Sequence, residues 1–142
     1  MSSLRMALPG GLSAVLVDRL HAGVLVMGRE AAVDPELLPI TALVVEEICT
    51  NIMEHSNATW LKVKVGRRGQ RIRVEVADDG KPFNPVDAIK AQADLDLKQM
   101  KERRLGLYMV KHLSSSVAYT RDPQGQNRTE FEFDPEAQDK AG

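Results

Sequence analysis

The chain has 142 residues, of which 43% are hydrophobic, and its formal net charge is −1. This length suits one compact domain that can bury a core without disulfides or structural metals, and the near-zero charge argues against a general nucleic-acid or membrane-surface binder. Because Cys49 is the only cysteine and no apolar run approaches the roughly 18 residues of a membrane span, we expect a cytoplasmic protein without an intramolecular disulfide.

The first half of the sequence predicts a short strand and two helices. Residues 5–8 form a brief apolar segment, which we expect to be a weak edge strand. From residue 12 to about 29, apolar residues recur at helical spacing: Leu12, Val15, Leu16, Leu20, Val24 and Met27. Asp34 followed by Pro35 is typical of a helix start, and this second helix runs to about residue 55. Its apolar stripe contains Ile40, Leu43, Val44, Ile48 and Ile52.

The second half predicts mainly strands. Apolar and polar residues alternate on both sides of the glycine-containing segment 66–69, which indicates a hairpin with its turn there. The further expected elements are a short helix over 87–93, a charged segment over 94–104, a helix over 106–113, and strands over 117–121 and 129–133 around a turn at 122–125. Helices packed on one face of the sheet would complete such a domain.

The most informative stretch lies in the second predicted helix and contains Glu47, Asn51 and His55. A helix turns by about 100° per residue, so residues four apart drift by only about 40°, and these polar side chains share one flank. The adjacent flank is apolar. The pattern is typical of a helix edge that faces a ligand, and a solvated amphipathic helix explains it equally well.

A second stretch, Asp78-Asp79-Gly80, ends a predicted strand and is followed by Pro82 and Pro85. Asp-Asp-Gly is ordinarily a turn, and the prolines favour that interpretation. However, a carboxylate at a strand end can also accept a hydrogen bond from an exocyclic amine. A glycine beside it lets a flat ring approach the main chain.

Two further stretches are weaker. Residues 103–111 form a basic segment that leads into a helix, where unpaired amides together with Lys101, Arg103 and Arg104 suit a phosphate. A solvated basic turn is the alternative. The segment from Gly125 to Thr129 is readable simply as a hairpin turn.

Taken in order, the four stretches resemble the pattern of the GHKL ATPase/kinase superfamily. The chain is similar in particular to its small bacterial branch, the anti-sigma-factor serine/threonine-protein kinases, over about residues 6–133. Residues 47–55 resemble the N box of that branch, and residues 78–85 resemble its first glycine box. The resemblance implies one domain over 1–142, with its core at about 6–134, in an α+β class. This is the Bergerat, histidine-kinase-like ATPase fold, a two-layer α/β sandwich with helices on one face of a mixed, mostly antiparallel sheet.

The resemblance also implies that the domain binds ATP and Mg²⁺. Asn51 would hold Mg²⁺ through its side-chain oxygen, and Glu47 would orient or deprotonate the attacking hydroxyl. His55 would shape the helix end near the phosphates. Asp78 would bind the adenine amino group, and Gly80 would admit the ring. The remaining residues implied in nucleotide binding are Phe83, Arg104, Leu105, Gly106, Leu107 and Thr129.

The function implied by the resemblance is that of an ATP-dependent serine-protein kinase and anti-sigma factor in a partner-switching system. Its expected partners are a sigma factor and an anti-anti-sigma (STAS-domain) protein, whose serine would accept the phosphate. A homodimer is also implied, and direct contact with nucleic acid or membrane is not expected.

One departure from the family pattern leaves other functions open. Arg103 and Arg104 stand where the family usually has a glycine pair, and they would either clamp phosphate or obstruct lid closure. This motivates a second interpretation, a non-catalytic nucleotide-binding regulatory module that sequesters a protein partner. A third is the catalytic domain of a two-component histidine kinase, against which His21 lacks the acidic neighbour usual beside an acceptor histidine.

Overall fold

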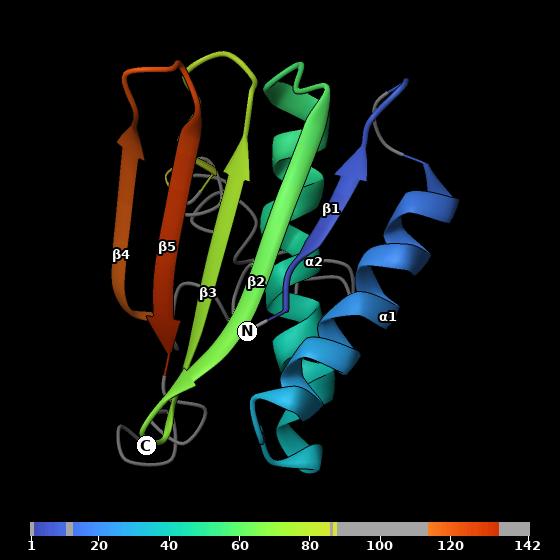
Figure 1. The fold of residues 1–142 in the computed structure, drawn as a ribbon, viewed down its shortest axis with the longest axis vertical. Coiled ribbons are helices and arrows are strands. Elements are labelled where there is room, and N and C mark those ends of the chain that lie inside the picture. The colour runs from blue at the N-terminus through green and yellow to red at the C-terminus, as the bar shows by residue number, and fades with distance from the viewer. Residues whose placement is uncertain (1, 11–12, 86, 88–113, 134–142) are drawn as a thin grey trace, which may run out of the picture.

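Five strands form one antiparallel sheet in the order β1-β2-β3-β5-β4, and two long helices lie on one of its faces (Figure 1). The computed structural model describes residues 2–10, 13–85, 87 and 114–133. The elements are β1 (Leu4–Ala7), α1 (Ala14–Glu30), the 3₁₀ turn η1 (Pro35–Leu37), α2 (Leu38–His55), β2 (Trp60–Arg68), β3 (Arg71–Asp78), β4 (Ser114–Arg121) and β5 (Asn127–Phe133). Every pairing between these strands is antiparallel, which agrees with the expected, mostly antiparallel sheet. The predicted helices over 87–93 and 106–113 fall almost entirely outside the described residues.

Helix α1 confirms the predicted amphipathic helix, with one correction. It begins after Ser13, whose hydroxyl accepts a hydrogen bond from the Leu16 amide at 3.2 Å. Its core face consists of Leu16, Leu20, Val24, Met27 and Gly28. Val15 is 68% exposed, so its expected place in the apolar stripe was wrong. A one-residue step of about 100° carries Val15 off the face that Leu16 shares with residues three and four positions apart.

Helix α2 begins later than predicted and buries more of its surface. Asp34 accepts a hydrogen bond from the Glu36 amide at 3.0 Å, so it caps the η1 turn, and the α-helix proper starts at Leu38. Ile40 and Leu43, two members of the predicted apolar stripe, are only partly buried. The buried set is Leu38, Thr41, Ala42, Val44, Val45, Ile48, Cys49, Asn51, Ile52 and Met53. This wide buried face reflects the contacts of α2 with both α1 and the sheet (Figure 1).

The β2–β3 hairpin has a tighter turn than the sequence suggested. Arg67 pairs with Ile72 and Arg68 with Arg71, so the turn is Gly69-Gln70 and the predicted turn at 66–69 was wrong. Gly69 has φ +63°, and a glycine at the first of two turn positions matches the twist of the flanking strands. Gly66 lies inside β2, opposite Arg73.

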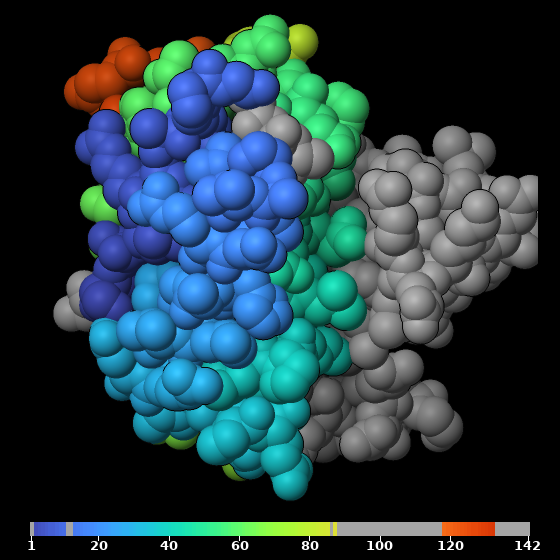
Figure 2. Space-filling view, turned by 90° about the vertical axis from the view of Figure 1, so that its right-hand side faces the viewer, coloured from blue at the N-terminus to red at the C-terminus, as the bar shows by residue number. Residues whose placement is uncertain are grey.

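Each central strand has one apolar face, which α1 and α2 cover, and one polar face. The buried strand residues alternate with period two, as predicted: Leu61, Val63, Val65, Ile72, Val74, Val76 and Phe131. On the polar face, Arg73 forms ion pairs with Glu75, Glu130 and Glu132 at 3.5, 3.3 and 3.2 Å. Seen a quarter turn away, α1 and the start of the chain form much of the outer surface on the helical side (Figure 2).

The apolar face changes character at one end of the sheet. Asp78 ends β3 and Asn127 begins β5, and the two are register partners on the same face as the core residues Val76 and Phe131. Both side chains are buried, at 2% and 1% exposure. The sheet therefore buries a polar pair where its hydrophobic interior ends.

Val24 and Val26 offer a matched test of this packing, because they lie on one helix with 0% and 50% exposure. We expect Val24→Ala to lower the free energy of unfolding by about 1.5–3 kcal/mol through lost burial and a cavity. Val26→Ala should change it by less than about 0.5 kcal/mol, since the side chain is solvated and alanine favours helix. Urea unfolding at equal slopes would measure both, and equal losses would contradict the described orientation of α1.

Candidate functional site

The predicted polar flank of α2 runs along the half of that helix that leads to its C-terminal end. Glu47 is half-buried, Asn51 is 8% exposed, and His55 is largely exposed. The Asn51 side-chain amide donates a hydrogen bond to the Glu47 carbonyl at 3.3 Å, one turn earlier. Because its nitrogen donates to the helix, the oxygen is the side-chain atom of Asn51 that could bind a cation.

Asp78 is held in one orientation by two donors. The backbone amide of Gly80 and the side-chain Nδ2 of Asn127 donate to Asp78 Oδ1 at 2.8 and 3.0 Å. Both of these hydrogen bonds end on the same oxygen. Among the described residues, these donors leave Oδ2 as the atom of Asp78 that can accept a hydrogen bond from a bound molecule.

Burial raises the pKa of Asp78 above its ordinary value, and hydrogen bonds from Asn127 and Gly80, together with the charge of Arg121, oppose that rise. The neighbouring charge of Asp79 adds to it. When it is ionised, a buried carboxylate with such donors is a strong acceptor, because nearby water does not compete with the ligand.

Asp79 has a different role from its neighbour. It accepts hydrogen bonds from the backbone amides of Thr59 and Trp60 at 2.7 and 3.1 Å, and also from the Thr59 hydroxyl. Although partial burial raises the pKa of Asp79, these hydrogen bonds lower it overall. Asp79 thus ties the start of β2 to the end of β3, while Asp78 points inward.

The loop after β3 packs directly on the end of α2. The Lys81 amide donates to the Ser56 carbonyl at 2.8 Å, and the rings of His55 and Phe83 lie 5.6 Å apart between centroids. A Cβ atom on Gly80 would meet the Ser56 carbonyl oxygen at 2.5 Å. We expected Gly80 to admit a ligand ring, whereas the structure gives another reason for this glycine: the space is filled by the end of α2.

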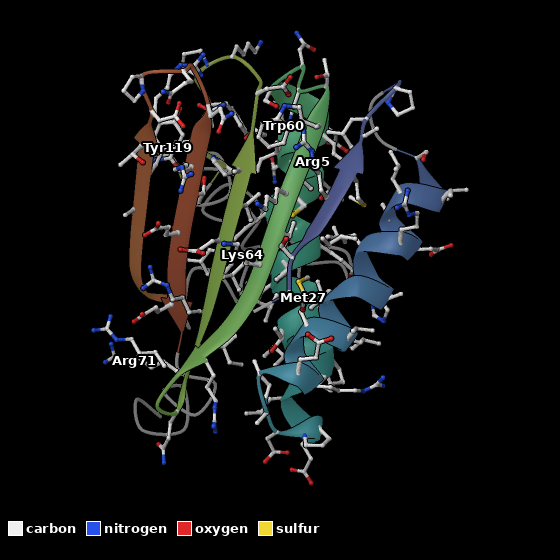
Figure 3. All side chains as sticks on the ribbon, viewed as in Figure 1. Arg5, Met27, Trp60, Lys64, Arg71 and Tyr119 are labelled. Carbon is white, nitrogen blue, oxygen red and sulfur yellow. The ribbon has the colours of Figure 1, made fainter. Side chains whose placement is uncertain are left out.

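These contacts bring the second and first predicted motifs into one region. Cys49, on α2, is buried, and the charge of Asp78 contributes, after burial itself, to raising the pKa of its thiol. Cys49 is therefore a core residue, as expected. Tyr119, on β4, lies toward the same end of the sheet as Trp60 at the start of β2, and Arg71 lies at the other end (Figure 3).

The remaining predicted residues divide into two groups. Thr129 is 1% exposed, pairs with Val76, and follows Asn127 by two positions on the same face of β5. The lid residues Arg104, Leu105, Gly106 and Leu107, with Lys101 and Arg103, lie outside the described residues.

Asn127 is the residue that the sequence interpretation missed, because it was treated as part of a turn. Its amide nitrogen donates to the carboxylate of Asp78 and to the carbonyls of Gly80 and Lys81, at 3.0, 3.3 and 2.8 Å. The turn is in fact closed by Asp122, which accepts from the amides of Gln124 and Gln126. The alternation of Asn127, Thr129 and Phe131 in the sequence is the signal that could have placed Asn127 on the buried face.

The side chains of this region suit a hard cation whose other ligands come from a substrate and from water. Among the described residues, no group of three or more His, Cys, Asp or Glu side chains could hold a metal ion. Asn51 offers one neutral oxygen, and Mg²⁺ is commonly held by few protein oxygens together with substrate phosphates and water. Asn51 therefore fits a Mg²⁺ ion that is bound mainly by a polyphosphate.

The chain matches the family model of the histidine kinase-like ATPase domain over residues 14–130, and it belongs to this family. No curated protein matches it. Among solved structures, a chain of the SiaB–SiaC complex from Pseudomonas aeruginosa is 15% identical, with 92% of this chain and 88% of that chain covered and a TM-score of 0.59.

Two histidine kinases are less similar in structure. AdeS from Acinetobacter baumannii is 12% identical, with 94% and 68% of the two chains covered and a TM-score of 0.44. The catalytic domain of ThkA is 13% identical, with 94% and 97% covered and a TM-score of 0.39. The family and the described sheet and helices confirm the predicted α+β, histidine-kinase-like ATPase fold. Among the described helices, none combines the length and apolar character that crossing a membrane requires.

The contact between Gly80 and Ser56 predicts a steric effect. Gly80→Ala would force its new methyl group against a backbone oxygen, so we expect a loss of about 1–3 kcal/mol in the free energy of unfolding. Gly10→Ala is the control, because a Cβ atom at Gly10 meets nothing within 4 Å. Chemical denaturation would compare them, and an unchanged stability for Gly80→Ala would show that the loop does not pack on α2 as described.

The two adjacent aspartates predict opposite pH dependences of stability. The raised pKa of Asp78 means that the folded state binds its proton more tightly than the unfolded state, so this stabilisation is present in acid and lost as pH rises through the folded pKa. The lowered pKa of Asp79 gives stabilisation that is present above the unfolded pKa and lost as pH falls. As pH rises from acid to neutral, the free energy of unfolding of Asp78→Asn should increase relative to wild type. Over the same range, that of Asp79→Asn should decrease relative to wild type. Slopes of one sign for both variants, in urea unfolding at several pH values, would refute this assignment.

Proposed function

We propose that this ATPase-family domain is an ATP-dependent serine-protein kinase and anti-sigma factor of a partner-switching system. The observation that carries the nucleotide part is the geometry of Asp78, which has one carboxylate oxygen held by Gly80 and Asn127 and the other left as an acceptor. This group lies beside the end of α2, whose polar flank contains Glu47 and Asn51.

The purine would bind at the end of β3. A 6-amino group donates a hydrogen bond, and Asp78 Oδ2 is a buried acceptor suited to receive it. Thr129, on the same face of the sheet, supports the adenine side, and Phe83 offers an apolar ring against His55.

The triphosphate would extend along α2. Asn51 would contribute one oxygen to Mg²⁺, and this ion supplies neutralisation of the charge that develops on the transferring phosphoryl group. Glu47 would accept the proton of the attacking serine hydroxyl. As the new bond from the serine oxygen to the γ-phosphorus forms, the bond from phosphorus to the ADP oxygen breaks. Positioning is the main requirement of such a transfer, and one carboxylate suffices for it.

The partner assignment is the finer part of the proposal. The similarity of residues 47–55 and 78–85 to the boxes of anti-sigma-factor kinases supports a sigma factor and an anti-anti-sigma (STAS-domain) protein as partners. A STAS-domain serine would be the phosphate acceptor. The SiaB–SiaC structure is of a complex between two proteins, and at 15% identity it speaks for the fold alone. Mg²⁺, ATP and a cytoplasmic site of action belong to the same proposal.

The proposed role of Glu47 predicts a separation of binding from transfer. Glu47→Gln should lower the rate of phosphotransfer to a cognate STAS-domain protein by about 10²–10⁴-fold, the range expected for loss of a general base. Its affinity for ADP should change by less than about threefold, because the amide keeps the size of the side chain. Radiolabelled transfer assays and calorimetry would measure the two quantities.

Glu46→Gln is the matched control, because Glu46 precedes Glu47 on α2 but contacts His21 of α1 at 2.8 Å. Its phosphotransfer should match wild type. If wild type binds nucleotide and a partner but transfers no phosphate, the chain is a non-catalytic regulatory module. Phosphate transfer to a histidine in place of a serine would instead favour the histidine-kinase interpretation.

A further inference from the structure

The orientation of the Asn127 side chain is determined by its neighbours on β4. Its Oδ1 accepts hydrogen bonds from the Tyr119 hydroxyl at 2.5 Å and from Arg121 Nη1 at 2.9 Å. An amide oxygen accepts and an amide nitrogen donates. With two donors on the oxygen side, the nitrogen must face Asp78.

The direction of the Tyr119 hydrogen bond is fixed as well. The backbone amide of Phe83 donates to the Tyr119 hydroxyl oxygen at 3.1 Å, so the hydroxyl accepts from Phe83 and directs its own proton to Asn127. A chain of donors thus runs from Phe83 through Tyr119 and Asn127 to Asp78. Each member is satisfied on both sides, and such networks hold a buried group in one state.

Arg121 joins the same network to the loop after β3. Its Nη1 donates to the Gly80 carbonyl at 3.0 Å and to Asn127 Oδ1 at 2.9 Å. Asn127 in turn donates to the carbonyls of Gly80 and Lys81. The Asn127 side chain therefore contacts both the carboxylate of Asp78 and the main chain that follows it, and Arg121 supports the same segment.

We propose that Asn127, oriented by Tyr119 and Arg121, is a positioning residue that determines the base specificity of the site. It occupies one oxygen of Asp78 and so directs the other to the 6-position of a purine. This inference rests on the proposed binding of a nucleotide at Asp78, and it adds the residues that make the binding selective.

The selectivity follows from the chemistry of the 6-position. Adenine carries an amino group there and donates, whereas hypoxanthine carries a carbonyl and accepts. An ionised carboxylate held at this point pairs with the donor and is repelled by the acceptor. If Asn127 is removed, Asp78 can rotate and take up a proton, and a protonated carboxyl group can donate to the carbonyl instead.

The charged and titratable groups that act on Asp78 are few in the described part of the chain. They are Asp79, which raises the pKa of Asp78, and Arg121, which lowers it. Cys49, on α2, is close enough for the charge of Asp78 to raise the pKa of its thiol. The hydrogen bond from Asn127 also lowers the pKa of Asp78. Loss of that hydrogen bond should therefore raise the pH below which the site no longer prefers adenine.

The test compares the affinities of ADP and inosine diphosphate by calorimetry in the presence of Mg²⁺. The two nucleotides share their phosphates, so the ratio of the two dissociation constants isolates the base. We expect wild type to prefer ADP. Asn127→Ala should reduce that preference by about ten- to a hundredfold, the range of a hydrogen bond to a charged group, and the preference should fall off at a higher pH than in wild type. Gln124→Ala, in the exposed turn before Asn127, should match wild type.

Tyr119→Phe covers the case in which Asn127→Ala fails to fold, because it removes one hydroxyl and leaves the ring. It should also reduce the preference for ADP, by a smaller factor, since Arg121 still holds the Asn127 oxygen. If wild type binds neither nucleotide, the proposed function fails. If wild type prefers ADP and the folded variants keep both that ratio and its pH profile, the role of Asn127 is overturned while the proposed function stands.

Discussion

The hydrogen bond between Asn127 and Asp78 joins the two strands on which the candidate site depends. It links side chains 49 residues apart in the sequence at the point where the sheet stops being apolar. A buried carboxylate without donors would be protonated or would destabilise the fold. With Asn127, Gly80 and the charge of Arg121 around it, the same carboxylate becomes an oriented acceptor.

The two adjacent aspartates show how one dipeptide provides both a structural contact and a candidate binding group. A strand places successive side chains on opposite sides, so Asp78 and Asp79 meet different surroundings. Asp79 accepts hydrogen bonds from the main chain where β2 begins, which ties the start of β2 to the end of β3. Asp78 faces the helices and is left with one oxygen for another molecule. Local structure therefore separates two residues of the same chemistry into two roles.

The sequence predicted the parts of the fold that depend on local periodicity. The alternation in β2 and β3 gave the hairpin and its buried face, and the four-residue spacing of Glu47, Asn51 and His55 gave the polar flank of α2. Where the period is not sharp, the prediction was less accurate: Val15 is exposed, and Gly66 lies inside a strand. Glycine is common in turns but also occurs in strands. Here the strand pairing places Gly66 inside β2 and Gly69 in the turn.

Features that depend on pairing between distant segments were not visible in the sequence. The importance of Asn127 arises from its register with Asp78, which no spacing along the chain encodes. The reason for Gly80 was likewise hidden, because Ser56 reaches it from the end of another element. The family pattern pointed to residues that the fold brings into one region, whereas the way these residues support one another depends on contacts between distant segments.

The packing of Gly80 against Ser56 affects which ligand lengths the site would accept. Because the loop after β3 packs on Ser56, which caps α2, and on His55 at the helix end, Asp78 and the polar flank of α2 are tied together. The separation between them is set when the chain folds. A ligand that spans both would be selected for its reach as well as for its two ends.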